Sequence, residues 1–219
     1  MDKISLSWLK KKAQAEGGLI VYADEATFRQ SPTIAQTWAP INTQPQIPTE
    51  GQRFSKKVFG AVTLKSDFVY RISNDNFSVD TYLAFLEEKV LSKLYRKNHR
   101  LYFIQDNASY HKAEETYKWF KTNRKRIEVF NLPPYFPELN AIERIWHYTR
   151  CQATHNRYYP DIKELQKSLQ VTFATIILHP EKISGLLALF LIFIVEKIMR
   201  GYITGSFITA LFVCFLDIS

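Results

Sequence analysis

The sequence is poor in cysteine: only Cys151 and Cys214 occur among its 219 residues. They lie far apart and form no CxxC pair, so a disulfide framework and a structural zinc site are both disfavoured. The five histidines include no pair at i, i+4 spacing, which leaves a histidine-based metal site with little support. These counts favour a reducing compartment, and the cytoplasm is the simplest location.

The chain also lacks a secretory signal and a long uninterrupted apolar run. Its first residues are charged throughout, unlike a signal peptide. Two segments near the C-terminus, 186–195 and 207–216, are nearly all apolar, but Glu196, Lys197 and Arg200 lie between them. Neither segment reaches the roughly 18 apolar residues of a membrane helix, so no membrane partner is predicted.

The sequence has fewer acidic residues than basic residues, 21 against 29. The formal net charge is +8 and the sequence pI is about 9.4, the sign expected of a protein that approaches a polyanion. The basic residues gather in clusters at 10–12, 53–57, 96–100 and 121–126. Most such clusters are solvated faces, so any single one is weak support for contact with nucleic acid.

Length and hydrophobic periodicity predict one α/β domain. A chain of 219 residues suits one sizeable domain and is short for two. Apolar runs separated by turn residues predict a mixture of strands and helices, with one hairpin turning at 65–67. The expected strands are 19–23, 58–64, 68–72, 101–105 and 127–130; the expected helices are 3–16, 78–94, 113–123 and one that begins near Asn140.

A proline-rich segment that runs into an amphipathic helix is the most informative motif. Pro133, Pro134 and Pro137 fix φ and remove backbone donors, so this segment is expected to be a stiff extended connection. Asn140 stands where the N-cap of the next helix is expected, and Glu143 then occupies the N3 position. A carboxylate there has a fixed direction, although a lone Asn-x-x-Glu is more often only a helix cap.

Two aspartates stand at the ends of predicted buried strands: Asp24 follows 19–23, and Asp106 follows 101–105. If these strands are neighbours, the two carboxylates project side by side, and the helix carrying Glu143 completes a cluster by packing across that edge. Three carboxylates repel one another without a cation, and hard oxygen ligands suit Mg²⁺ or Mn²⁺. Two such ions roughly 4 Å apart would promote phosphoryl transfer on a nucleic acid.

Four motifs then occur in order: Tyr22–Phe28, Trp38–Pro40, Gln105–His111 and Leu132–Glu143. Together they resemble the catalytic domain of bacterial insertion-sequence transposases related to the mariner superfamily, which are DDE superfamily endonucleases. The 36 residues between the second and third carboxylates, 107–142, are close to the family's spacing. The resemblance covers approximately residues 5–185. The chain departs from the family at Phe136 and Ala141, and neither change removes a carboxylate.

The resemblance implies an RNase H-like fold, a mixed β-sheet flanked by helices, with Asp24, Asp106 and Glu143 as the catalytic and metal-binding triad. Two Mg²⁺ or Mn²⁺ ions are the implied cofactors. Such enzymes hydrolyse the end of a mobile element with a metal-activated water, and the freed 3′-hydroxyl then attacks target DNA. The implied partners are therefore the element's terminal repeats and target DNA, in a homo-oligomeric complex associated with the nucleoid.

Further residues are candidates by their positions. Contacts to the scissile phosphate or to the metal ligands are expected from Glu25, Asn107, His111 and Asn140. For Asn107 and His111, capping of the helix after the strand is an equally good reading. The candidates for contact with DNA are Arg53, Lys56, Lys57 and Arg144.

Both ends of the chain depart from the resemblance. Residues 1–185 are assigned to the catalytic domain, and fewer than 20 residues precede its first predicted strand. An N-terminal helix-turn-helix domain is therefore expected to be missing or to be encoded separately as a DNA-binding half. Residues 186–219 form an apolar tail, expected either to be helical and packed on the domain or to be an out-of-frame extension.

Two alternatives to an active transposase domain stay open at this point. Another RNase H-like nuclease would share the three carboxylates but not the Pro-Pro-Tyr loop at 133–135. A catalytically silent remnant would bind DNA and modulate an intact transposase. The triad argues against chemical inactivation, whereas the missing N-terminal domain argues against autonomous transposition.

Overall fold

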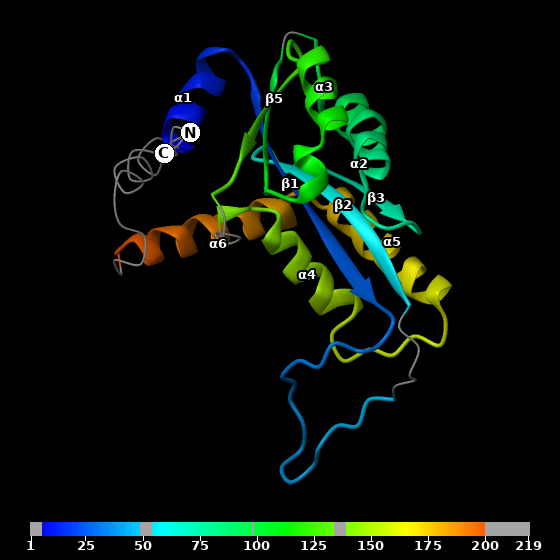
Figure 1. The fold of residues 1–219 in the computed structure, drawn as a ribbon. Coiled ribbons are helices and arrows are strands. Elements are labelled where there is room, and N and C mark those ends of the chain that lie inside the picture. Colours follow the sequence, from blue (N-terminus) through cyan, green and yellow to red (C-terminus); the bar gives the residue numbers. More distant parts are fainter. Residues whose placement is uncertain (1–5, 49–53, 98, 134–138, 200–219) are drawn as a thin grey trace.

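A computed structural model describes residues 6–48, 54–97, 99–133 and 139–199 (Figure 1). A five-stranded mixed sheet in the order β3-β2-β1-β4-β5 forms its centre. β1 pairs antiparallel with β2 and parallel with β4; β2 and β3 form the antiparallel hairpin, and β4 and β5 run parallel. The strands are β1 Leu19–Arg29, β2 Ser55–Thr63, β3 Phe68–Ser73, β4 Leu101–Gln105 and β5 Ile127–Asn131. The five predicted strands and the mixed sheet are thereby confirmed.

Helices cover both faces of the sheet, because alternate residues of its strands are apolar on both sides. On one face, Val21, Ala23 and Phe103 pack against α2, η1 and α3. On the other, Ile20 and Tyr22 pack against α1, α4, α5 and α6. The helices are α1 Leu6–Ala15, α2 Val79–Phe85, η1 Leu86–Leu94, η2 Ser109–Lys112, α3 Glu114–Thr122, α4 Glu143–Ala153, α5 Ile162–Leu178 and α6 Pro180–Met199.

The first strand is longer than predicted. β1 was expected to end at Asp24, but it continues to Arg29 because its antiparallel partner β2 pairs with it as far as Ser55. The parallel partner β4 pairs only with Leu19–Tyr22. Asp24 therefore lies within a strand, just beyond the point where one of its two neighbours has ended.

The predicted helix 78–94 is only partly α-helical. Ser78 caps its start in a capping box with Thr81, but residues 86–94 form a π-helix, η1. The π-helix turns four apolar side chains onto the sheet: Leu86, Val90, Leu91 and Leu94 are buried. Periodicity identified the buried face but not the change of helix type, since both helices present a similar apolar stripe over so few turns.

The boundary predicted at residue 185 falls inside α6. This helix begins at Pro180, where the missing N–H of proline is tolerated. Its Ile183, Leu187 and Phe190 are buried in the same core cluster as Tyr22, and the rings of Phe190 and Tyr22 lie 6.1 Å apart. Among the described residues, no helix combines the length and apolar character needed to cross a membrane.

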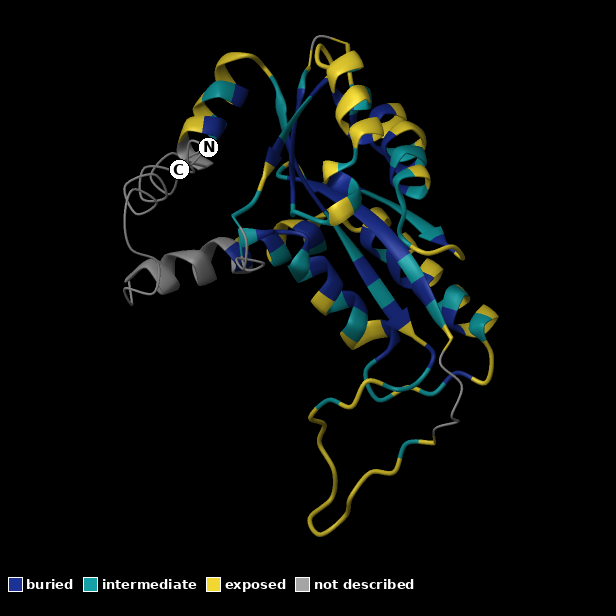
Figure 2. Cartoon of the chain, in the orientation of Figure 1, coloured by how far each residue is buried: buried dark blue, intermediate teal, exposed yellow. Residues whose placement is uncertain are grey.

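The loop after β1 projects away from the sheet (Figure 2). Trp38, from one of the four motifs, is fully exposed there, and Ile34 and Ile41 are also largely exposed. Asn156 anchors the start of the loop, because its side chain both accepts from and donates to the backbone of Ala35. The body of the domain therefore holds only the base of this loop.

Candidate active site

The side chain of Asp24 lies on the face of β1 that is covered by α4. Trp146 of α4 donates a hydrogen bond from Nε1 to Asp24 Oδ2 at 3.2 Å. Gly60 of the neighbouring strand β2 pairs with Asp24. The Trp146 ring occupies the space beside this glycine. The indole thus fixes both the position and the direction of the carboxylate.

Negative charge accumulates around Asp24. Burial, followed by the charges of Glu25, Glu143 and Asp106, raises the pKa of Asp24 to about 8. Because three other carboxylates contribute, the side chains of β1, the end of β4 and the start of α4 act on one another electrostatically. A bound cation would relieve this repulsion and favour the ionised form.

Asp106 follows β4 directly, as predicted. Its Oδ1 accepts a hydrogen bond from the Ala108 backbone N–H at 3.0 Å and lies 3.0 Å from His111 Nδ1. The hydrogen bond with His111 is the main reason that the pKa of Asp106 lies below its ordinary value. The carboxylate is therefore ionised and oriented, and half of its side chain is exposed to solvent.

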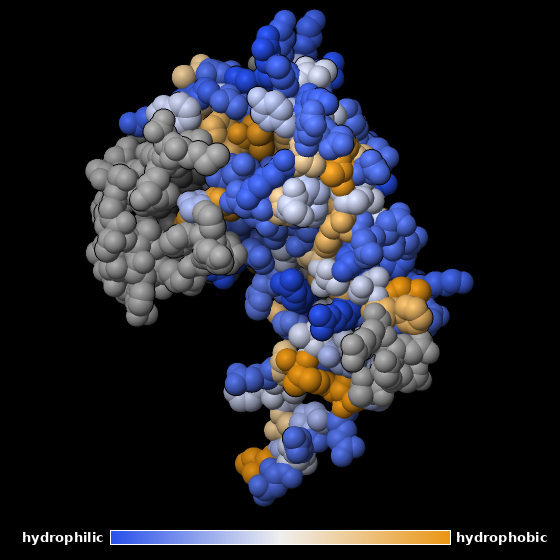
Figure 3. All heavy atoms as spheres, in the orientation of Figure 1, coloured by the Kyte–Doolittle hydropathy of each residue, from blue (hydrophilic) through white to orange (hydrophobic). Residues whose placement is uncertain are grey.

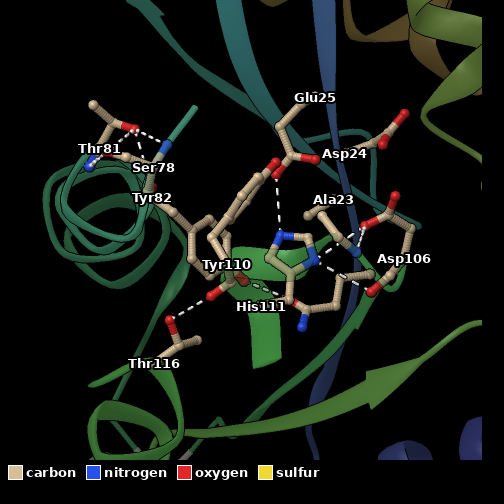
Figure 4. Close-up of polar contacts among 12 residues, drawn as sticks. Ala23, Asp24, Glu25, Ser78, Thr81, Tyr82, Asp106, Tyr110, His111 and Thr116 are labelled. Atoms are coloured by element: carbon tan, nitrogen blue, oxygen red, sulfur yellow. Dashed lines mark hydrogen bonds and ion pairs between the residues drawn. The ribbon is translucent and has the colours of Figure 1, made fainter. Parts of the chain in front are cut away.

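His111 bridges two carboxylates from different elements (Figure 4). Its Nδ1 faces Asp106, and its Nε2 lies 3.2 Å from Oε1 of Glu25 on β1. The imidazole is buried and packs against the rings of Tyr82 and Tyr110, whose centroids lie 4.5 and 4.7 Å from its own and 5.7 Å from each other. Burial alone would lower the pKa of His111, but the hydrogen bonds to Asp106 and Glu25 raise it to about 9.

The predicted helix cap before Glu143 is wrong. α4 begins at Glu143 itself, and no side chain caps it. The Asn140 side chain is buried instead and donates from Nδ2 to the Ala23 backbone oxygen at 3.0 Å. A tertiary bond to β1 thus replaces the local cap, and it ties the start of α4 to the residue before Asp24.

The donors at this edge fit a hard divalent cation. Asp24, Asp106 and Glu143 offer only carboxylate oxygens, the ligands that Mg²⁺ and Mn²⁺ prefer. The repulsion that raises the pKa of Asp24 is what such a cation would offset. Asn140 Oδ1 is buried and receives no hydrogen bond from any described residue, so an acceptor is also left unsatisfied near β1.

A second set of possible ligands comprises Glu25, Asp106 and His111, whose donor atoms lie within 4.8 Å of one another. His111 uses opposite edges of its ring for the two carboxylates, so one ion cannot replace both hydrogen bonds at once. The geometry is that of a hydrogen-bonded bridge. Only Asp106 belongs to both sets.

The other predicted site residues differ in their burial and in their hydrogen-bond partners. Asn107 does not cap a helix: its Nδ2 donates to the Leu132 backbone oxygen and so joins the ends of β4 and β5. Lys56 is buried and donates to Asn74. Lys57 is half-buried, with Nζ 3.2 Å from the Thr27 hydroxyl. Arg144 is also half-buried.

Arg53 and the segment 134–138, which includes Pro134 and Pro137, lie outside the described residues. Sequence reasoning missed Trp146 and the two tyrosines that pack against His111. Trp146 follows Ile142 by four residues, a spacing that predicts only a shared buried face. Tyr82 lies in α2, and nothing local in the sequence links it to a histidine 29 positions later.

Residues 19–166 match the family described as DDE superfamily endonuclease. The chain belongs to this family. Among curated proteins, the chain is similar to the insertion element IS630 uncharacterized 39 kDa protein of Shigella sonnei, with 28% identity over 167 residues, 76% of this chain and 48% of that protein. The transposable element Tc3 transposase of Caenorhabditis elegans is 26% identical over 178 residues, 75% of this chain and 51% of that protein.

The chain therefore spans about half the length of these curated relatives. The Mos1 strand transfer complex has a TM-score of 0.57 at 18% identity and covers 84% of this chain and 58% of its own. The catalytic domain of Mos1 mariner transposase has a TM-score of 0.52 at 18% identity and covers 84% and 88%. These likenesses confirm the RNase H-like fold predicted for this DDE superfamily endonuclease.

The titrating groups of this DDE site predict how stability depends on pH without a metal ion. The raised pKa of Asp24, about 8, means that its contribution is present below about pH 3.8 and lost as pH rises through about 8. The raised pKa of His111, about 9, makes a contribution that is present below about pH 6.5 and lost as pH rises through about 9. Both contributions to the free energy of unfolding therefore decrease as pH rises.

We therefore expect the melting temperature of the metal-free protein to fall by several degrees between about pH 6.5 and about pH 9, since 1 kcal/mol is about 2–4 °C for a domain of this size. Calorimetry at several pH values measures this. Asp24→Asn should flatten the slope, and Mg²⁺ should restore more stability at the high end. A melting temperature that rises with pH would contradict the charge accumulation.

Proposed function

We propose that this chain is the catalytic domain of a DDE transposase, which cleaves DNA strands and joins the freed 3′ end to target DNA by attack of its hydroxyl on a target phosphodiester, with the target's own 3′-oxygen as the leaving group. The observation that carries the proposal is the electrostatic proximity of Asp24, Asp106 and Glu143, which come from β1, the end of β4 and the start of α4. Membership of the DDE superfamily endonuclease family supports it independently.

In this proposal the three carboxylates hold two Mg²⁺ or Mn²⁺ ions. When bound, such ions activate the attacking oxygen and stabilise the leaving oxygen of a phosphodiester. The protein's own part is positioning: Trp146 orients Asp24 through its indole N–H, and Asn140 fixes the start of α4 against β1. Carboxylates on a strand, a strand end and a helix start form a rigid frame for in-line attack.

Glu25 and His111 are proposed to position Asp106 without binding an ion themselves. A protonated His111 donates to both Asp106 and Glu25, and the rings of Tyr82 and Tyr110 pack against the imidazole. Asp106 Oδ1 is occupied by this bond and by Ala108 N–H. Its second oxygen is the atom best placed to bind a cation.

The proposed partners are DNA, as terminal repeats and as target, and further copies of the chain in a transposition complex associated with the nucleoid. A separately encoded DNA-binding half is proposed to supply recognition of the terminal repeats. The net charge of +8 supports a polyanionic partner. Joining of a cleaved end to a second DNA molecule separates this proposal from that of a simple RNase H-like nuclease.

A Mn²⁺ titration by calorimetry tests the site before any DNA is added. We expect wild type to bind Mn²⁺ and Asp106→Asn to lose most of this binding, because one substitution removes a ligand from a cluster that has only oxygen donors. Asp75→Asn is the matched control, since Asp75 is exposed and its side chain lies outside the site.

Binding that survives equally in both variants would contradict the proposed metal site. Nicking of a supercoiled plasmid in the presence of Mn²⁺, with and without a chelator, then tests the reaction. Loss of nicking with the chelator and its recovery when Mn²⁺ is restored are the expected results. Nicking that persists in the chelator would show that the reaction does not need the ions.

A further inference from the structure

Seven exposed basic side chains gather at the end of the sheet opposite to the candidate active site. They come from the end of η1 and its connection to β4, and from the end of α3 and its connection to β5. No Asp or Glu occurs in residues 89–105 or 116–127. We call the seven side chains the basic end surface: Lys93, Arg96, Lys97, Lys121, Arg124, Lys125 and Arg126. Figure 3 shows hydrophilic side chains massed at this end, at the top of the view.

The backbone beneath the basic end surface is firmly held. The Leu101 N–H donates to the Arg126 oxygen at 2.8 Å, and Arg100 Nη2 donates to the Arg124 oxygen at 2.6 Å. These bonds join the two connections just where β4 and β5 begin to pair. The Arg126 guanidinium lies 5.8 Å from the centre of the Tyr95 ring, so it also bridges both connections.

The basic end surface contains a depression, and its positive charges are not paired with acidic side chains among the described residues. An open depression of about 700 Å³ is lined by residues 121–126. Neighbouring cations are used differently: Lys12 and Arg100 both form ion pairs with Glu128, at 2.9 and 2.8 Å. Among the described residues, no comparable ion pair involves the seven members of the surface. Their mutual repulsion is left for an external anion to relieve.

The basic end surface is too far from the carboxylates to take part in the chemistry. Asp106 follows the last residue of β4, whereas the surface adjoins its first residue. A five-residue strand separates the two by roughly 16 Å, a span of about five base pairs along duplex DNA. One duplex engaged at the site can therefore also reach this end of the sheet.

We infer that the basic end surface binds the phosphate backbone of duplex DNA away from the cleavage point. The inference rests on the proposed function, since DNA is the substrate in both. Clustered Lys and Arg side chains on a fixed backbone, in segments that contain no Asp or Glu, are suited to successive phosphates and carry no base specificity. The surface would hold the duplex in register while the carboxylates act on one phosphate.

The test compares two triple substitutions that change net charge equally. Lys97, Arg124 and Lys125 are replaced by Gln in the surface variant; Lys65, Lys163 and Lys167, which are exposed elsewhere, are replaced by Gln in the control. Binding of a fluorescent duplex of arbitrary sequence is measured over a series of salt concentrations. Each lost phosphate contact should reduce the log-log salt slope by about 0.9.

We expect the slope of the surface variant to be smaller than that of wild type by about 2–3, and that of the control to change by less than about 1. Equal changes of the salt slope in both variants would show that binding depends on the net charge of the protein rather than on this surface, and would overturn the inference. A salt slope in the surface variant equal to that of wild type would also overturn it. Melting temperatures verify folding, and Lys125→Glu alone serves if the triple variant does not fold.

Plasmid nicking separates this inference from the proposed function. If wild type nicks DNA but the salt slope does not change in the surface variant, only the inference fails. If the slope changes as expected but wild type does not nick DNA with Mn²⁺, the surface stands and the catalytic proposal fails.

Discussion

Replacing Asp24, Asp106 or Glu143 by the corresponding amide should reduce strand cleavage by about 1000-fold or more. Each amide keeps the shape of the side chain but removes an anionic ligand, and loss of about 4 kcal/mol of transition-state stabilisation corresponds to that factor. Affinity for DNA should stay within a few-fold of wild type, since phosphates are held by basic side chains rather than carboxylates. Single-turnover cleavage of a labelled duplex measures the rate.

The matched control for this series is again Asp75→Asn, which should cleave at the wild-type rate. Cleavage that survives any one of the three substitutions would remove that residue from the triad. A loss of DNA affinity equal to the loss of cleavage would instead point to a binding defect. Melting temperatures are compared in metal-free buffer, where Asp24→Asn and Glu143→Gln relieve repulsion around Asp24 and should not destabilise the protein. Asp106→Asn also removes the ion pair with His111 and is expected to lower the melting temperature.

Glu25→Gln distinguishes a positioning residue from a metal ligand within the same series. Because Glu25 contacts His111 and not the proposed ions, we expect a loss of about 10–100-fold, typical of residues that orient a ligand. A loss as severe as that of Asp24→Asn would make Glu25 a ligand. The set formed by Glu25, Asp106 and His111 would then be the metal site.

The sequence predicted the sheet because its strands are apolar runs bounded by turn residues, a local signal. It predicted Asp106 correctly after the last residue of β4, a strand that pairs with β5 along its whole length. Asp24 was expected at a strand end as well, and this was wrong. The end of β1 depends on how far β2 pairs with it, and β2 lies more than 25 residues away in the chain.

Tertiary contacts also explain the other differences. Asn140 has the residue type and place of a helix cap, but its side chain reaches Ala23 on β1 instead, a bond across 117 positions. The bridge from Glu25 through His111 to Asp106 joins residues 86 and 5 positions apart. The sequence pattern and the family resemblance were therefore enough to predict the candidate metal ligands. The residues that orient these ligands could be identified only from the three-dimensional structure.

Removing the Trp146 side chain is expected to give the largest loss of stability. The indole is fully buried and packs edge-on against Phe28, Phe68 and Phe173, with ring centroids 6.0–6.4 Å apart. Trp146→Ala should lower the free energy of unfolding by about 3–5 kcal/mol, the range for large aromatic residues in a core. Urea denaturation followed by circular dichroism measures the change; Trp8→Ala, at a half-exposed tryptophan, is the control.

Gly60 explains why a tryptophan fits at this position. A Cβ added to Gly60 would lie 2.5 Å from Cη2 of Trp146, so the indole fills the space that any larger residue would need. Gly60→Ala should therefore cost about 1–3 kcal/mol through overpacking. In a Trp146→Phe background, where the outer ring atoms are gone, the same substitution should cost less, giving a coupling of about 0.5–3 kcal/mol.

The double-mutant cycle also connects this packing to the chemistry. Trp146→Phe keeps most of the buried surface but removes the N–H that holds Asp24 Oδ2. It should therefore lower the rate of cleavage by more than its small effect on unfolding would suggest. Additive effects of the two substitutions on stability would show that Gly60 and the indole do not compete for space. An unchanged cleavage rate in Trp146→Phe would show that Asp24 is oriented by other groups.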